Sequence, residues 1–222
     1  QFTIARNSVH TSSTRSSVRT STYTFSNVST DDGATAATSL AGTTFSYKGT
    51  TVTGFRAGTN GWMTFNTALA PTAYTNAIGV NSANAGLFPL WDDLICSPNN
   101  FTAAAMDGCM RYKIVGTLGS GTAQIIIEWR EMDNFAVPST SINFQVILDE
   151  LGNTITYRYG RMEGFTGGAN TTWSYSLGLN AWSFGTPGSY TDVLAMRDEG
   201  TTNFDYTPAT LASSGLNGNM RV

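Results

Sequence analysis

The sequence is short of charge. Asp, Glu, Lys and Arg make up 12% of the 222 residues, against roughly a quarter in an average protein. The formal net charge is −3, and no basic stretch is denser than Arg15 to Arg19. Because a protein that binds nucleic acid has to neutralise phosphates with clustered cations, we expect no nucleic-acid partner.

Long apolar runs, helical periodicity and histidine are also scarce. No stretch approaches the roughly 18 to 20 apolar residues that cross a bilayer, so the sequence predicts no membrane span. No window of about ten residues carries an apolar stripe of helical period. The only histidine, His10, lies in a polar N-terminal segment, where a folded scaffold is not expected to orient it for Ser-His-Asp or Cys-His catalysis.

Cysteine is limited to Cys96 and Cys109. A bridge between them would close a short loop and stabilise the fold by about 3 kcal/mol in the chain-entropy model. We predict this disulfide, the alternative being two free buried cysteines. Two thiols alone do not complete a structural zinc site.

The chain is instead rich in glycine, with 23 residues, and its polar positions are mostly Ser, Thr and Asn. This composition is typical of extracellular proteins, and a chain that begins at Gln1 is what removal of a signal peptide leaves. We therefore expect a secreted, cell-surface protein without cofactors. Residues 1–30 are predicted to form an N-terminal arm and residues 31–222 a single β-sandwich domain.

From about Ala34 onward, short β-branched and aromatic runs alternate with turn residues, as in a sandwich or barrel. The predicted strands are Thr43 to Tyr47, Thr51 to Arg56, Trp62 to Phe65, Gly86 to Leu90, Met110 to Val115, Gln124 to Arg130, Ile142 to Leu148, Thr154 to Tyr159, Ser174 to Leu179 and Val193 to Met196. The predicted fold class is all-β: a two-sheet antiparallel sandwich, jelly-roll-like, with an extended N-terminal arm.

Two turns and one irregularity refine this prediction. Lys48-Gly49 and the segment Asp149 to Asn153 should each join antiparallel strands, since Gly and Asn tolerate positive φ. Alternation along the second hairpin puts Phe144 and Tyr157 in the core. The run Ile125 to Ile127 breaks the alternation and predicts a strand covered on both sides.

The arm has its own strand signal. Phe2, Ile4, Val18 and Phe25 are apolar residues in a Ser/Thr-rich segment that cannot form a core by itself. We expect it to pair with a neighbouring subunit and drive head-to-tail assembly. The alternative is an arm folded back on its own sandwich as an edge strand.

Six short motifs follow one another along the chain. They are Asn60-Gly61-Trp62, Leu87 to Leu94, Ile127 to Arg130, Asn143 to Leu148, Ile155 to Gly160 and Ser176 to Leu179. Over about Ala34 to Trp182 this series resembles the β-sandwich domains common in secreted and cell-surface proteins of the Bacteroidota. The resemblance implies a jelly-roll-like fold and a surface location, and it supplies no catalytic residues.

Three sets of side chains are candidate sites. A glycoside hydrolase needs two carboxyls about 5 to 9 Å apart across a sugar cleft. Glu131 and Asp133 would share one strand face, but Glu128 would fall on the opposite face of a regular strand. Asp92 and Asp93, joined by Asp107 or by Asp31-Asp32, could supply oxygen ligands for Ca²⁺.

Trp173 and Trp182 border a predicted strand, where exposed rings could stack on sugars. The favoured function is therefore a non-enzymatic structural or adhesive subunit that associates with copies of itself. A carbohydrate-binding module that takes a surface glycan is the alternative, and a glycoside hydrolase ranks third.

Overall fold

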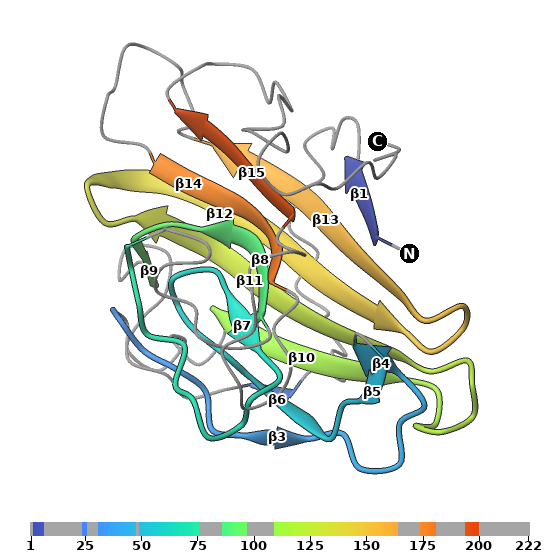
Figure 1. The fold of residues 1–222 in the computed structure, drawn as a ribbon. Coiled ribbons are helices and arrows are strands. Elements are labelled where there is room, and N and C mark those ends of the chain that lie inside the picture. The colour runs from blue at the N-terminus through green and yellow to red at the C-terminus, as the bar shows by residue number, and fades with distance from the viewer. Residues whose placement is uncertain are drawn as a thin grey trace, which may run out of the picture.

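The protein is built from β-strands. The computed structural model describes residues 2–6, 24–25, 31–47, 49–75, 86–96, 109–163, 174–180 and 194–199, and every regular element in these ranges is a strand (Figure 1). None of the described residues forms a helix that is long and apolar enough to span a membrane. The all-β prediction is confirmed.

The strands form two main sheets and a small hairpin. The larger sheet has seven strands in the order β1-β13-β12-β11-β10-β2, with β9 paired to β11. Its strands are β1 (Phe2–Arg6), β2 (Thr24–Phe25), β9 (Leu94–Cys96), β10 (Met110–Val115), β11 (Gln124–Asn134), β12 (Val137–Asp149) and β13 (Thr154–Glu163). All pairings in it are antiparallel except the one between β1 and β13.

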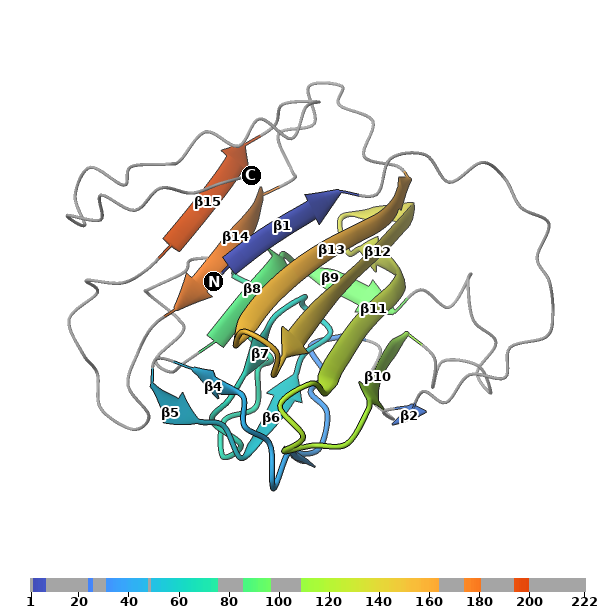
Figure 2. The same ribbon diagram turned by 90° about the vertical axis from the view of Figure 1, so that its right-hand side faces the viewer.

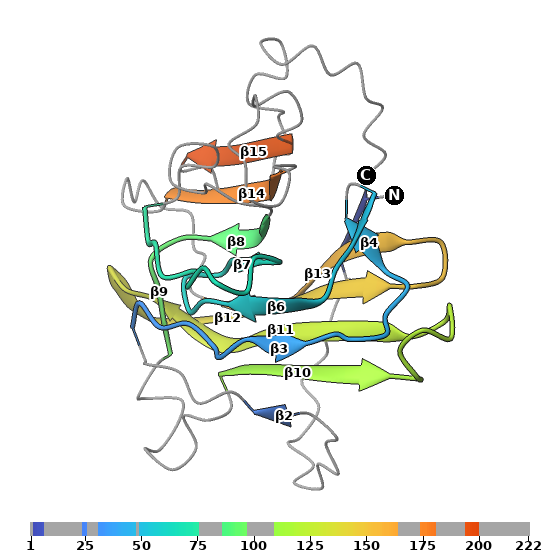
Figure 3. The same cartoon turned by 60° about the horizontal axis from the view of Figure 1, so that its bottom comes forward.

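The second sheet has six strands in the order β15-β14-β8-β7-β6-β3. Its strands are β3 (Thr38–Ser39), β6 (Gly54–Ala57), β7 (Met63–Thr64), β8 (Gly86–Trp91), β14 (Ser174–Asn180) and β15 (Leu194–Glu199), while β4 (Ser46–Tyr47) and β5 (Thr50–Thr51) pair with each other. The two sheets are layered against each other (Figure 3), and the main core cluster draws on both. The two-sheet sandwich is confirmed.

Both predicted turns are present. Gly49, at φ +77°, lies between the paired strands β4 and β5. Gly152 and Asn153, at φ +79° and +52°, lie in the turn between β12 and β13. Glycine takes this left-handed region without steric cost, and asparagine is the side chain that tolerates it best.

The core follows the predicted alternation of the β12–β13 hairpin. Phe144 and Tyr157 are buried, and the outward side chain of Arg158 is exposed. The prediction for the three isoleucines is wrong in part. Ile125 and Ile127 are buried, but Ile126 is only half-buried, because the first part of β11, from Gln124 to Trp129, alternates regularly and turns Ile126 to the outer face.

Tyrosine hydroxyls join the two sheets through the core. The Tyr157 hydroxyl donates to the carbonyl of Gly178 at 2.5 Å and accepts the N–H of Phe88 at 3.1 Å. Burial raises the pKa of Tyr157 well above its usual value, so its donor proton is retained. The Tyr159 hydroxyl donates to the carbonyl of Pro89. Strand β13 is thereby bonded to β8 and β14 of the opposite sheet.

One carboxylate ties together the loops at one end of the sandwich. Glu150 is 7% exposed and accepts from the Thr43 hydroxyl and from the N–H groups of Thr44, Gly119 and Gly121 at 2.7 to 3.0 Å. Burial opposes its ionisation, but these donors outweigh burial and lower its pKa to about 2. Glu150 therefore stabilises the fold above its normal pKa, and this contribution is lost as the pH falls toward 2.

The N-terminal segment supplies edge strands to the larger sheet. β1 runs parallel to β13, from Phe2 opposite Ile155 to Arg6 opposite Tyr159, and β2 pairs with β10 at the other edge (Figure 2). Of the residues predicted for assembly, Phe2, Ile4 and Phe25 lie in these strands, and Val18 lies outside the described residues. In this chain β1 is folded back on its own sheet, which is the alternative to pairing with a neighbour.

Removing the Tyr157 hydroxyl tests the link between the sheets. We expect Tyr157→Phe to lower the free energy of unfolding by about 1 to 3 kcal/mol, because it leaves a buried carbonyl and a buried N–H without their partner. Urea denaturation measures the loss. Tyr74→Phe is the control, since Tyr74 is 54% exposed. Equal stability of the two variants would contradict the bridging role.

Candidate functional site

Three carboxylates meet at one end of the sandwich. Asp31 and Asp32 precede β3, and Asp93 lies between β8 and β9. One oxygen from each lies within 4.8 Å of the other two. Asp31 and Asp93 are half-buried and Asp32 is exposed. Such a group of oxygens at a loop is a donor set that a hard cation such as Ca²⁺ prefers.

Asn60 holds the backbone around this cluster. It is fully buried, and its amide nitrogen donates to the Asp32 carboxylate at 2.8 Å and to the carbonyl of Thr72 at 3.0 Å. Its amide oxygen accepts the N–H of Leu94 at 3.0 Å, and its main-chain carbonyl accepts the N–H of Asp92 at 3.3 Å. One side chain thus fixes the approach of three loops.

The turn after Asn60 requires glycine. Gly61 has φ +76°, and a Cβ there would lie 1.8 Å from the carbonyl oxygen of Leu90. From the sequence, Asn60 and Gly61 are predicted only as members of a motif series, and not as part of a site. Its role in the carboxylate cluster depends on contacts with residues far away in the sequence.

Two carboxylates of this cluster, Asp31 and Asp93, have raised pKa values. Burial raises the pKa of Asp93, and the charges of Asp31 and Asp32 raise it further. Burial and the charge of Asp32 likewise raise the pKa of Asp31. The ionised forms of Asp31 and Asp93 therefore oppose folding. Stability from these groups is fully present below their normal pKa and is lost as the pH rises through the raised values.

Asp92 is placed differently from its neighbour Asp93. It is 5% exposed, and its carboxylate accepts the N–H of Asp93 at 2.9 Å and the side-chain amide of Asn134 at 3.0 Å. Burial dominates and raises its pKa to about 7. Of the predicted pair, the structure brings Asp93 to Asp31 and Asp32 and turns Asp92 toward Asn134. Asp107 lies outside the described residues.

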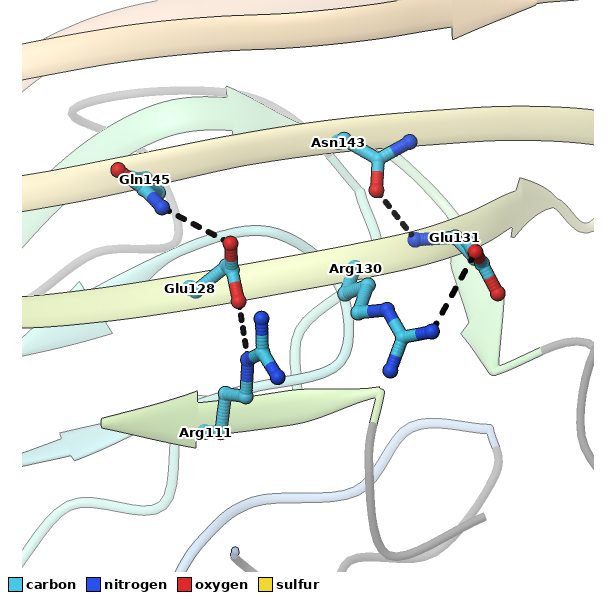
Figure 4. Close-up of polar contacts among 6 residues, drawn as sticks. All are labelled: Arg111, Glu128, Arg130, Glu131, Asn143 and Gln145. Atoms are coloured by element: carbon cyan, nitrogen blue, oxygen red, sulfur yellow. Dashed lines mark hydrogen bonds and ion pairs between the residues drawn. The ribbon is translucent and has the colours of Figure 1, made fainter. Parts of the chain in front are cut away.

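A row of polar side chains crosses the outer face of the larger sheet. Arg111, Glu128, Gln145 and Arg158 stand opposite one another on β10, β11, β12 and β13. Glu128 accepts from the Arg111 guanidinium with one oxygen and from the Gln145 amide at 2.8 Å with the other (Figure 4). Arg158, at the end of the row, is exposed.

A β-bulge interrupts β11 beside this row. The register shifts between Trp129 and Met132, and Glu131 adopts φ +51°. The Glu131 N–H donates to the Asn143 side chain at 3.0 Å, and its carboxylate lies 3.5 Å from the Arg130 guanidinium (Figure 4). Both Trp129 and Met132 remain in the core, so the regular alternation predicted to separate Glu128 from Glu131 does not hold.

The same bulge affects the carboxylate pair considered for glycoside hydrolysis. The Glu131 side chain is 23% exposed, whereas Asp133 is 2% exposed and lies opposite Ile95 of β9. A carboxylate that is this deeply buried does not reach a sugar in an open cleft. The structure therefore does not present Glu131 and Asp133 as a matched pair.

The two cysteines lie at bonding distance. Cys96 ends β9 and Cys109 directly precedes β10, with their Cα atoms 5.8 Å apart and their sulfurs joined in a disulfide. Both are buried. The candidate sugar platform, Trp173 and Trp182, lies outside the described residues.

The molecule is a two-sheet β-sandwich domain held by a disulfide, a cross-link typical of proteins outside the cell. The chain matches the family described as NIDO related over residues 7–219, and it belongs to that family. Family and disulfide together indicate a domain of extracellular type. No curated protein and no solved structure matches the chain. Nothing in the family match concerns the Bacteroidota, so that part of the resemblance stays an expectation.

Neutralising one carboxylate tests the electrostatics of the cluster. Asp93→Asn preserves the side-chain size and removes a like charge. We expect it to raise the free energy of unfolding by about 0.5 to 1 kcal/mol at pH 7. The gain should shrink toward pH 4, because carboxyls with raised pKa values are protonated to a larger extent there. Urea denaturation in EDTA at both pH values measures it.

Asp93→Glu, which retains the charge, is the control for this experiment. A loss of stability on Asp93→Asn at pH 7 would contradict the repulsion. Repeating the series in calcium chloride tests the calcium hypothesis. Calcium that stabilises the wild-type protein but not Asp93→Asn would support it, and an equal effect on both would count against it.

Proposed function

We propose that this chain is a non-enzymatic extracellular structural subunit that associates with copies of itself through its N-terminal segment. The observation that carries the proposal is the position of β1, which lies at the end of the larger sheet and, among the described strands, pairs only with β13. A short terminal strand added to a sheet edge is the means by which many β-proteins recognise a partner segment.

The arrangement of the acidic residues supports a non-enzymatic role. Both oxygens of Glu128 accept hydrogen bonds from Arg111 and Gln145. Glu150 is occupied by loop donors, and Asp133 is buried. General acid–base catalysis needs carboxyls within reach of a substrate. The carboxylates named here hold strands and loops together instead.

Deleting residues 1–6 tests the proposal. We expect the full chain to be polymeric and the truncated chain to be a folded monomer, because β1 contributes one edge ladder that pairs with β13. Sedimentation velocity measures the assembly state, and circular dichroism checks the fold. A variant with Gly and Ser at positions 1–6 controls for chain length. Unchanged assembly of the truncated protein would contradict the proposal.

A glycan-binding role is the second candidate, and the outer face of the larger sheet favours it. Arg158 is exposed on this face, and Lys113 and Arg130 are half-buried there. Arg111 is buried and bonded to Glu128, so it is not one of the cations offered to a ligand. The amide side chains of Asn143 and Gln145 bond to the Glu131 N–H and to Glu128, beside Arg130 and Arg111 (Figure 4). Guanidinium groups bind carboxylates in a bidentate manner, and amides bind hydroxyls. The face therefore suits an acidic polysaccharide.

Arg158 is the residue with which to test this second role. We expect Arg158→Ala to weaken binding of polygalacturonate roughly tenfold, the loss of one charge-assisted hydrogen bond, and Arg158→Lys to weaken it less. Neutral dextran serves as the uncharged probe. Isothermal titration calorimetry that finds no binding, or equal binding of both polysaccharides, would contradict an acidic-glycan site.

A further inference from the structure

The edge of β13 is a defined acceptor for a strand. Residues Ile155 to Tyr159 pair with Phe2 to Arg6 in an unbroken parallel register. On its other side β13 pairs with β12 in an antiparallel ladder. Without β1, this edge would present a row of unpaired N–H and C=O groups to solvent.

The donor strand is joined to the sandwich by a long connection. β1 and β2 lie at opposite edges of the larger sheet, five strand positions apart (Figure 2), which corresponds to about 24 Å at the usual strand spacing. Residues 7–23 connect them and span up to about 60 Å when extended. The connection is therefore long enough to carry β1 past its own sheet to the β13 of another molecule.

We propose that β1 of one copy exchanges onto the β13 edge of a second copy, in the parallel register seen within this chain. This inference rests on the proposed self-association and specifies its partner and its interface. The exchanged ladder contains the same hydrogen bonds as the closed one, so exchange costs little enthalpy. In dilute solution β1 pairs with the β13 of its own molecule, because the covalent connection gives it a high effective concentration there. The population of the exchanged form increases with protein concentration.

The geometry of the exchange sets the form of the assembly. The donor strand and the acceptor edge are different surfaces, so the contact is heterologous. Every subunit has one donor strand to give to a neighbour and one acceptor edge to receive a strand from another. Such a contact gives an open chain unless its rotation closes into a ring. The strand β2, which stays paired to β10 of its own molecule, anchors each donor.

Cysteine cross-linking across the register tests the inference. Thr3 stands opposite Thr156, so we mix a Thr3→Cys variant with a Thr156→Cys variant and oxidise mildly. We expect a disulfide-linked dimer whose yield rises with protein concentration. The matched control replaces Thr156→Cys by Thr154→Cys, which lies two residues away on the same strand. That offset of about 7 Å along the strand exceeds what a disulfide bridges, so the yield should fall roughly tenfold.

The double variant Thr3→Cys with Thr156→Cys separates the outcomes. If β1 exchanges, the double variant should form covalent oligomers. If β1 never leaves its own molecule, the double variant gives only an internally bridged monomer and the mixture of single variants gives no dimer. That result would overturn the inference. Equal yields from the control pair would overturn the register. If assembly depends on residues 1–6 yet no cross-link forms, the proposed function stands and only the exchange fails.

Discussion

The hydrogen bonds of the Tyr157 hydroxyl connect the two layers on which everything else is built. Tyr157 reaches from β13 to the main chain of both β8 and β14, and Trp129 of β11 reaches the Gly58 carbonyl in the same way at 2.7 Å. These bonds satisfy buried polar groups that the core could not otherwise tolerate. They also fix the position of β13 relative to the opposite sheet, so the edge of β13 that pairs with β1 has one defined orientation.

The carboxylates in the loops at the two ends of the sandwich have pKa values shifted in opposite directions. Glu150 is surrounded by donors and its pKa is lowered to about 2, whereas Asp93 faces two like charges and its pKa is raised. The first carboxylate stabilises the fold while ionised, and the second destabilises it. A cation held between these carboxylates would offset the repulsion. The calcium hypothesis is one offset that the oxygen donors suit.

The sequence could predict what is local and periodic. The β12–β13 hairpin followed from strict alternation and from Gly152 and Asn153 in its turn, and the disulfide followed from the short spacing of Cys96 and Cys109. Strands β3 and β9 were missed because they span only two and three residues. The bulge was missed because Glu131 adopts a conformation normally left to glycine. The contact between Asp31 and Asp93 depends on the topology of the sheets. From the sequence, Asp31-Asp32 and Asp107 are equally open as partners of Asp93.

The N-terminal strand connects this fold to a function. A sheet whose last strand comes from a long, separately anchored segment can be completed from within the molecule or from a neighbour. In the proposed extracellular assembly, each molecule completes the sheet of its neighbour. Negative-stain electron microscopy of the purified full chain over a range of concentrations tests this most directly. We expect filaments or closed rings that become more abundant as the protein concentration rises. Isolated monomers at every concentration would contradict assembly by strand exchange.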